Sequence, residues 1–390
     1  FVGPTTHMMM DYSSLQALEL LRTCQYSNQK NERQKHATLF STMDYTKTTG
    51  GQKLLKTVIV QPSKDLETIR ARQNAVKELV DNAELFEGLA QVMKNIPKDH
   101  ESVCLNFIVN VHPPSDRSKW ICQAVSRLIR LRALLRTLPM LQDALQKTHS
   151  LLFGAIRIAA SSEAFAATLS TLSTTLIEEE NMELQKAKNN VTHQIFAVQS
   201  EKNSVLDIAR REFCQISEEI HQLADHYRTS LGLPTLKLLY AAKRNFYFVV
   251  GKQQQGQEQS AGEIEVPDVF IPLRSPNAAT KVSYSTLELN VLNARLETAL
   301  GDCFDIIFNT FHDLVERIHG NARYLRGLSE ALNLLDLLLS FATYAKEMSP
   351  DQCTCPEVEA DGPLLIVEGR HPVLSSKNDG FQSNSTYLSS

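Results

Sequence analysis

Three side chains of a predicted helix have a spacing that could chelate a metal ion. His312, Glu316 and His319 fall on one face if the helix predicted at 292–318 includes them. Imidazole and carboxylate groups both bind zinc, but a zinc site needs further ligands at defined positions. The sequence offers no third defined ligand beside the two histidines, and apolar residues occupy the adjoining face. We therefore interpret the three side chains as the polar surface of a packed helix.

The motifs of the common enzyme classes are missing from the sequence. It has no GxSxG, HExxH or GxGxxG pattern, which argues against the usual hydrolases, zinc proteases and dinucleotide-binding enzymes. Gly251 and Lys252 are followed by glutamine, where a P-loop needs serine or threonine. Cys353 and Cys355 are spaced more closely than a CxxC pair and have no second pair, so we expect a loop there. We expect no catalytic site, metal or cofactor in this chain.

Composition favours a helical protein of a reducing compartment. Hydrophobic residues make up 43% of the chain, whereas 15 glycines and 14 prolines are few for a loop-rich all-β protein. Five of the seven cysteines stand alone inside amphipathic stretches, as reduced core cysteines do. We expect no membrane span, because Arg157 and Asp336 interrupt the most apolar stretches, and no export signal. The first residue is Phe1, so we expect a part of a longer protein.

Six basic residues form the sharpest candidate for a binding surface. They lie in or near one segment of the chain: Lys237, Lys243, Arg244, Lys252, Arg274 and Lys281. Lysine and arginine on a projecting loop bind DNA phosphates without reading the base sequence. The formal net charge of -4 excludes binding by overall basicity, so any such contact must be local. Nearby acidic residues leave a solvated surface open as the alternative.

Two long helices must position this basic segment. In the second half of residues 176–231, apolar residues repeat at alternating spacings of three and four: Phe213, Ile216, Ile220, Leu223 and Tyr227. This is the pattern of a coiled-coil seam, and residues 292–318 carry a second helical stripe. Thirty residues of helix span roughly 45 Å, so the pair is expected to form an arm.

The hydrophobic period changes from 3.6 to 2 between these two helices. Four segments are expected to be short strands: 236–241, 246–250, 269–273 and 281–285. The first two flank the sequence Ala-Lys-Arg-Asn, which predicts a β-hairpin with Asn245 in the left-handed region. The sequence thus predicts a mainly α fold, in which a helical lever body carries a long coiled-coil arm capped by a small β tip at about 236–285.

Further helices complete the predicted body. Asp65 resembles an N-cap, followed by an amphipathic helix that ends near Asn82, and Pro139 is expected to bend or stop a helix that covers 121–135. A helix at 321–347 is followed by a strand at 363–367. We expect four regions along the chain: a first helical core and lever part at 1–175, the arm at 176–291, returning lever helices at 292–352, and the incomplete start of another domain at 353–390.

The order of four stretches resembles the lever and clamp region of the MutS family of DNA-binding ATPases. They are LFSTMDYTKTTGG at 39–51 with its continuation to Leu79, residues 230–250 with 266–271, residues 332–342, and residues 368–374. Within the family, the runs FAVQS at 196–200, LDIARR at 206–211 and LDLLLSF at 335–341 are similar to the meiotic, crossover-promoting MutS homologue 4 type. Together the stretches cover nearly the whole chain.

This resemblance implies a fold of MutS core, lever and clamp domains and a role in binding DNA. It implies a heterodimer with a second MutS homologue on branched intermediates such as Holliday junctions, in the nucleus on meiotic chromosomes. The six basic residues would contact the DNA backbone. No membrane is expected among the partners of the protein. ATP and magnesium are implied only for the full-length family, whose ATPase domain would begin at 368–374. The chain as given would not be an enzyme.

Three departures from the family pattern accompany the resemblance. No Phe-x-Glu occurs, so the wedge that reads mismatches is missing, and the sequence stops before the glycine-rich nucleotide loop expected soon after Leu374. Asn245 stands where a glycine is usual in the hairpin. Two alternatives stay open at this point: a mismatch-repair MutS subunit, and a helical scaffold that binds protein but not DNA.

Overall fold

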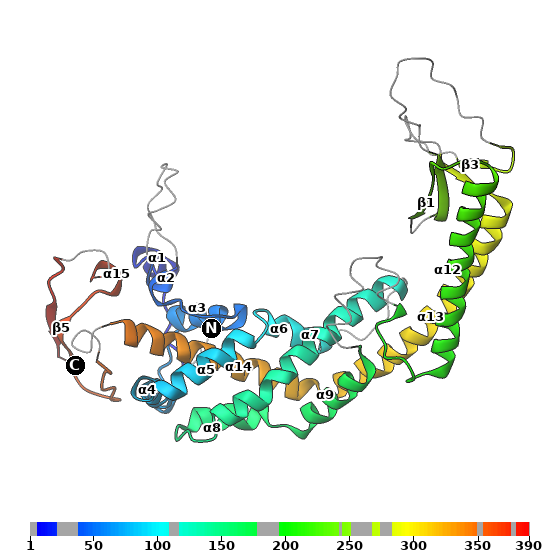
Figure 1. Ribbon diagram of the computed structural model, residues 1–390. Coiled ribbons are helices and arrows are strands. Elements are labelled where there is room, and N and C mark those ends of the chain that lie inside the picture. The colour runs from blue at the N-terminus through cyan, green and yellow to red at the C-terminus, as the bar shows by residue number, and fades with distance from the viewer. Residues whose placement is uncertain are drawn as a thin grey trace, which may run out of the picture. The chain divides into compact units, whose positions relative to one another are not determined.

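The computed structural model places the chain in two compact units (Figure 1). It describes residues 6–21, 38–108, 117–177, 195–241, 244–250, 267–273, 283–348, 354–375 and 380–389. Unit 1 comprises residues 1–112, 126–173 and 315–390, and unit 2 comprises residues 113–125 and 174–314. The predicted mainly α fold with a few short strands is confirmed. The four regions expected along the chain stay a prediction.

Unit 1 is built around one central helix, α14. The helices of this unit are α1 (Tyr12–Ala17), α2 (Leu39–Met43), α3 (Thr49–Val60), α4 (Leu66–Asp81), α5 (Ala83–Asn95), α6 (His100–Ile108), most of α7 (Arg117–Ala144), α8 (Leu151–Ala160), α9 (Glu163–Thr175), α14 (Ala322–Glu347) and α15 (Pro372–Ser375). Helices α3, α4, α6 and α8 pack against α14. The side chains of Leu328, Leu332 and Leu335 on α14 are completely buried, so this helix forms the core of the unit.

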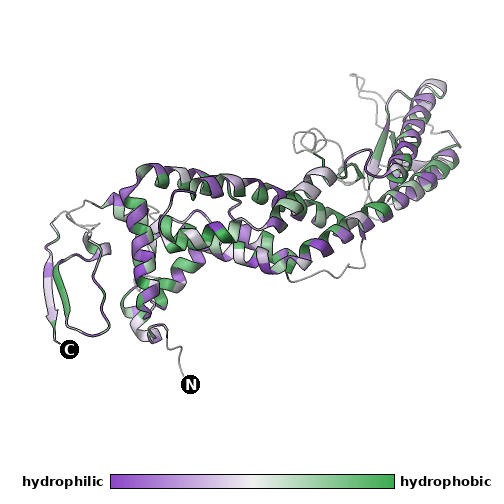
Figure 2. Ribbon diagram, turned by 90° about the horizontal axis from the view of Figure 1, so that it is seen from below, coloured by the Kyte–Doolittle hydropathy of each residue, from purple (hydrophilic) through white to green (hydrophobic). Residues whose placement is uncertain are grey.

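Local sequence signals set several helix ends in unit 1. The Asp65 carboxylate accepts a hydrogen bond from the Thr68 N–H at 3.0 Å, which confirms the predicted N-cap of α4. Asn82 ends α4 and caps α5 by accepting from the Leu85 N–H at 3.1 Å. The long helices carry both hydrophobic and hydrophilic residues along their length (Figure 2), as helices with one buried face do.

Helix α7 excludes one of the two outcomes expected at Pro139, a stop of the helix. The helix does not stop at Pro139 but continues to Ala144. A proline inside a helix removes one backbone hydrogen bond. Leu135, Leu138 and Leu141 around it are at most 2% exposed, and their packing holds the helix in spite of that loss.

The segment Leu151–Thr175 is long and apolar enough to cross a membrane, judged by length and composition alone. The expectation that no stretch reaches this length is wrong by that measure. A single such segment is weak evidence, because core helices of water-soluble proteins can have the same composition. Here the segment is two helices, since α8 ends at Ala160 and α9 begins at Glu163, and it buries Phe153 and Phe165 within the protein.

At the C-terminal side of unit 1 lies a separate two-stranded sheet. Strands β5 (Leu364–Gly369) and β6 (Asn384–Leu388) pair antiparallel. Strand β5 lies close to the strand expected at 363–367. Its apolar side chains Leu364, Leu365 and Val367 are more than half exposed in the part of the chain described.

Unit 2 holds two long helices and a small sheet. Its elements are α12 (Ser204–Ser230), β1 (Leu236–Ala241), β2 (Asn245–Val250), β3 (Ile271–Leu273), β4 (Ser283–Ser285) and most of α13 (Leu287–Gly320). The two helices run side by side, and the sheet lies near the end of α12 and the start of α13 (Figure 1). The helical stripe predicted at 292–318 is confirmed within α13.

The first long helix is shorter than the sequence suggests. We expected it from about residue 176, yet α12 begins at Ser204, where Asn203 caps it. Leu176 instead forms an isolated β-bridge with Val198. The buried Arg210 explains this fold: its guanidinium donates to the carbonyls of Ile195 (2.6 and 2.9 Å) and Val198 (2.8 Å), which a continuous helix would have kept for itself.

Candidate nucleic-acid interface

The predicted hairpin forms one edge of a four-stranded antiparallel sheet, with the strand order β1-β2-β4-β3. Strands β1 and β2 pair from Leu236↔Val250 to Ala241↔Asn245. Asn245 has φ +56°, so the left-handed conformation predicted for it is confirmed. Asparagine tolerates this region better than other side chains do, which lets it replace glycine at the turn.

An asparagine of α13 fixes the hairpin to the helices. Asn293 is 8% exposed and binds both backbone groups of Phe246: its Oδ1 accepts from the N–H at 3.2 Å, and its Nδ2 donates to the carbonyl at 2.9 Å. The Phe246 ring contacts His221 of α12 and Tyr240 of β1 edge-on. The start of β2 is therefore held from three directions.

An aromatic cluster forms the core beneath the sheet. Phe248 is completely buried, and its ring centroid lies 5.7 Å from those of Tyr227 and Phe270. The Tyr227 hydroxyl donates to the Glu288 carboxylate at 2.9 Å, and burial raises the pKa of Tyr227. Edge-to-face packing of this kind adds to the stability that burial provides.

Arg228 joins the end of α12 to the first strand. Its Nε donates to the Leu236 carbonyl at 2.9 Å, and its guanidinium forms an ion pair with Asp225. Sequence reasoning found neither Arg228 nor Asn293. Each binds the backbone of a strand outside its own helix, and no local sequence pattern marks that contact.

Two of the six basic candidates lie among the described residues. Lys237 is exposed on β1, opposite Val249, and Arg244 is exposed in the turn. Lys237 points away from the face that buries Leu236, because successive side chains of a strand alternate. Four residues of strand separate Lys237 from the turn, about 13 Å. A ligand that contacts both cations must therefore carry more than one anionic group.

The other four candidates lie outside the residues that the structure describes: Lys243, Lys252, Arg274 and Lys281. The strands expected beside them are confirmed in part, as β3 covers 271–273 and β4 covers 283–285. The assignment of all six to a DNA surface stays a prediction.

The residues considered for a metal site lie in ordinary packing environments. The His312 ring lies 5.6 Å from that of Phe308 and 6.3 Å from that of Trp120. His319 Nδ1 lies 2.8 Å from the Phe107 carbonyl oxygen. Cys355 is exposed, and Cys353 lies outside the described residues. Across the described part of the chain, no group of three or more His, Cys, Asp or Glu side chains is arranged to hold a metal ion.

In unit 1, the stretch at 39–51 meets α14 through a buried carboxylate. Asp336 is 1% exposed and accepts from the N–H groups of Lys47 (2.9 Å) and Thr48 (2.8 Å) and from the Thr48 hydroxyl (2.6 Å). Burial raises the pKa of Asp336, although its hydrogen bonds oppose that shift. The N-terminus of α3 is thereby held against the middle of α14.

Two glycines allow this close approach. A Cβ atom on Gly50 would lie 2.0 Å from Oδ1 of Asn333, and one on Gly51 would lie 2.2 Å from Oδ2 of Asp336. No side chain larger than hydrogen fits at either position without movement. The sequence TTGG and the aspartate of α14 thus form one structural unit.

Comparison with known proteins decides the family. The family model described as MutS domain III matches residues 13–342, which is most of the chain. The chain belongs to the MutS family. The resemblance inferred from the order of its segments is confirmed.

Relatives in the MutS family cover the chain from end to end. The chain is 31% identical over 397 residues to a protein of Arabidopsis thaliana named DNA mismatch repair protein MSH4, covering 100% of the chain and 49% of that protein. It is 28% identical over 392 residues to MutS protein homolog 4 of Homo sapiens, covering 100% and 39%. The Saccharomyces cerevisiae protein of that name is 26% identical over 390 residues, covering 98% and 41%. The chain spans half or less of the length of these relatives.

In the structure, two runs that resemble the MutS homologue 4 type contact each other. FAVQS at 196–200 and LDIARR at 206–211 are in contact, because Arg210 of the second binds the Val198 carbonyl of the first. The Arg210 guanidinium also lies over the Phe196 ring, 5.3 Å from its centroid. Asp207 pairs with Arg210 at 3.1 Å and accepts from the Glu201 N–H at 2.7 Å. These residues form one junction at the start of α12, with Val198 and Arg210 buried in it.

Proposed function

We propose that this chain is the lever and clamp portion of a MutS-family protein of meiotic recombination. In this proposal it binds branched DNA intermediates such as Holliday junctions, as a heterodimer with a second MutS homologue, in the nucleus. The observation that carries the proposal is a hairpin with exposed Lys237 and Arg244, held on two long helices. It occurs in a chain that is similar along its whole length to a part of MutS protein homolog 4.

The hairpin would act by backbone contact. Lysine and arginine at the tip neutralise phosphates without reading bases, so the affinity falls steeply with salt. Such binding suits a protein that recognises the shape of a junction rather than its sequence. The separation of Lys237 from the turn favours a polyanion over a single phosphate.

The long helices would transmit a signal from elsewhere in the full-length protein. ATP and magnesium, bound outside this chain, would shift the levers between two states and so change the grip of the clamp. The Asp336 junction supports this role, because it ties the N-terminus of α3 to α14 through buried hydrogen bonds. A lever must be stiff to carry a change of angle.

A mismatch-repair subunit is the second candidate, since the Arabidopsis thaliana relative carries mismatch repair in its name. The similarity to MutS protein homolog 4 of Homo sapiens and of Saccharomyces cerevisiae over nearly the whole chain favours the meiotic role. Binding to a four-way junction and to a mismatched duplex, measured side by side, separates the two. A clear preference for the mismatch would support repair.

The proposal is tested by reversing charge at the hairpin. The variant Lys237→Glu, Lys243→Glu, Arg244→Glu should bind a four-way junction at least about tenfold more weakly. The slope of log affinity against log salt should decrease by about 0.9 for each phosphate that the variant no longer neutralises. Fluorescence anisotropy over a salt series measures both quantities.

The matched control reverses two exposed cations elsewhere in unit 2, Lys202→Glu and Arg211→Glu. It should leave junction affinity close to that of the unchanged chain. If the hairpin variant also binds normally, the hairpin is not the DNA surface. A chain that does not bind DNA at low salt but forms a stable complex with a MutS partner would support the scaffold alternative.

A further inference from the structure

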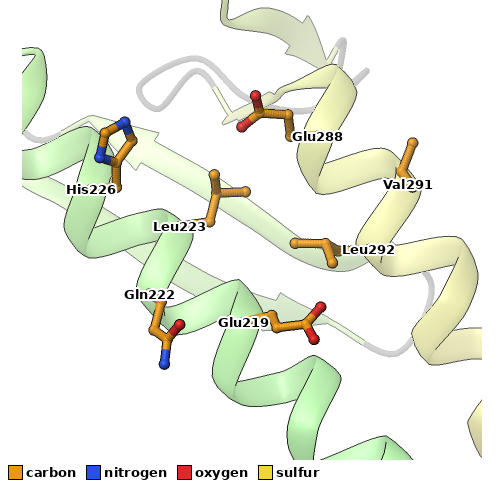
Figure 3. A pocket seen from close by; sticks show the side chains of 7 residues that line it. All are labelled: Glu219, Gln222, Leu223, His226, Glu288, Val291 and Leu292. Atoms are coloured by element: carbon orange, nitrogen blue, oxygen red, sulfur yellow. The ribbon is translucent and has the colours of Figure 1, made fainter.

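A groove runs between α12 and α13 in unit 2. Its volume is about 530 Å³, and both helices line it (Figure 3): Glu219, Gln222, Leu223 and His226 from α12, and Glu288, Val291 and Leu292 from α13. Leu223 and Leu292 point toward one another between the helices, and Glu219 and Glu288 lie at the two ends (Figure 3). The groove therefore has an apolar floor and a carboxylate at each end.

The apolar side chains on this face are unusually open to water. Val291 is 62% exposed, and Leu287, one turn before it on α13, is 73% exposed. Each square ångström of apolar surface removed from water contributes about 25 cal/mol. Aliphatic residues grouped beside a groove and rimmed by polar groups are typical of a protein interaction site.

The charge of the groove excludes nucleic acid as the natural occupant. Its two charged lining residues are glutamates, and no lysine or arginine lines it among the described residues. Glu288 accepts from the neutral Tyr227 hydroxyl at 2.9 Å and keeps its negative charge, whereas Glu219 pairs with Arg295 at 3.0 Å and shares its charge with that cation. A polyanion would be repelled here, whereas a cationic partner would be attracted.

The geometry favours a helix as the occupant. Two helices side by side with an apolar groove between them present the surface into which the side-chain ridges of a third helix pack. Apolar anchors at i and i+3 or i+4 would reach the floor formed by Leu223 and Leu292. A second copy of this groove is a poor occupant, since a symmetric contact would bring the same carboxylates together.

We propose that this groove binds an amphipathic helix of a partner protein, with an aliphatic stripe flanked by lysine and arginine. The aliphatic side chains cover Leu223, Val291 and Leu292, and the flanking cations meet Glu219 and Glu288. This contact is separate from the hairpin cations, so the chain can hold a protein at the groove and DNA at the hairpin at one time.

The test uses the full chain and two labelled helical peptides of about 18 residues. One peptide carries leucine on one face and lysine elsewhere, and the other has glutamate in place of lysine. Fluorescence anisotropy should show binding of the lysine peptide and at least about tenfold weaker binding of the glutamate peptide. The variant Leu223→Ser with Val291→Ser should bind the lysine peptide at least about tenfold more weakly than the unchanged chain does. The variant Glu219→Gln with Glu288→Gln should also bind this peptide more weakly, and its affinity should depend less on salt concentration.

The matched control is Val205→Ser with Ile208→Ser, which removes two exposed aliphatic residues from α12 outside the groove. This variant should bind the lysine peptide as the unchanged chain does. The variant Leu223→Ser with Val291→Ser should keep its affinity for a four-way junction. The outcome of the peptide measurements is independent of whether the hairpin binds DNA.

Three results would overturn the proposal. The first is equal binding of both peptides, or lysine-peptide binding that the groove substitutions leave unchanged. The second is a self-associated chain in sedimentation equilibrium that Leu223→Ser with Val291→Ser converts to monomer, which would make a second copy the occupant. The third is loss of junction binding in the Leu223→Ser with Val291→Ser variant and not in its control, which would assign the groove to DNA.

Discussion

Two junctions, one in each unit, join their elements by different physical means. In unit 1, α3 meets α14 through the buried carboxylate of Asp336 and two glycines that permit no side chain. In unit 2, the sheet packs on α12 and α13 through the rings of Tyr227, Phe248 and Phe270. The ion pair that joins α12 to α13, Glu219 with Arg295, lies at the surface.

This difference matches what each unit is proposed to do. A buried carboxylate with three donors is satisfied in one geometry only, so it fixes the angle between two helices. Apolar and aromatic contacts tolerate small displacements, because they depend on area more than on direction. A rigid lever and an adaptable clamp would need these two kinds of contact, respectively.

The largest expected effect is at the buried carboxylate. Asp336→Ala leaves the N–H groups of Lys47 and Thr48 and the Thr48 hydroxyl without their acceptor inside the protein. The cost should be about 3–5 kcal/mol of unfolding free energy, measured by urea denaturation. Glu330→Ala, at an exposed site of the same helix, is the control and should change stability by less than about 0.5 kcal/mol. Equal effects would show that Asp336 does not hold the junction.

A smaller effect is expected from one methyl group at the glycine pair. Gly51→Ala places a Cβ against the Asp336 carboxylate, 2.2 Å from Oδ2, and should destabilise unit 1 by about 2 kcal/mol. In α5, a Cβ on Gly88 would meet nothing within 4 Å. Gly88→Ala should therefore stabilise the protein by about 0.5–1 kcal/mol through helix propensity. Thermal unfolding of both variants shows whether each substitution lowers or raises the stability. A Gly51→Ala variant as stable as the unchanged protein would contradict the tight junction.

The smallest effect is expected at the surface pair of unit 2. Arg295 and Glu219 are partly exposed, with 49% and 33% of their side chains accessible. Their interaction should stabilise the protein by at most about 0.5 kcal/mol, because solvent screens it. A double-mutant cycle of Arg295→Gln and Glu219→Gln measures this interaction free energy directly. A coupling as large as the effect of Asp336→Ala would remove the contrast between the two units.

The candidate DNA surface was accessible to sequence reasoning only in part. The change of period from 3.6 to 2 located the hairpin, and Asn245 located its turn. The anchors could not be found this way, since Asn293 and Arg228 bind backbone groups of residues 47 and 8 positions away. Their side chains look like any other polar residue on a helix surface. The acidic groove was missed for the same reason, because its two walls come from separate helices.

By itself, the sequence determined the elements whose causes are local. Periodicity set the long helices, Asp65 set a helix start, and the order of motifs indicated the MutS family, because each signal lies within a few neighbouring residues. Only the tertiary structure decided where α12 begins, that α7 continues past Pro139, and that Asp336 is buried. In each case the deciding partner is distant in sequence or is a packed core: the carbonyls that Arg210 binds, the leucines around Pro139, and the N-terminus of α3.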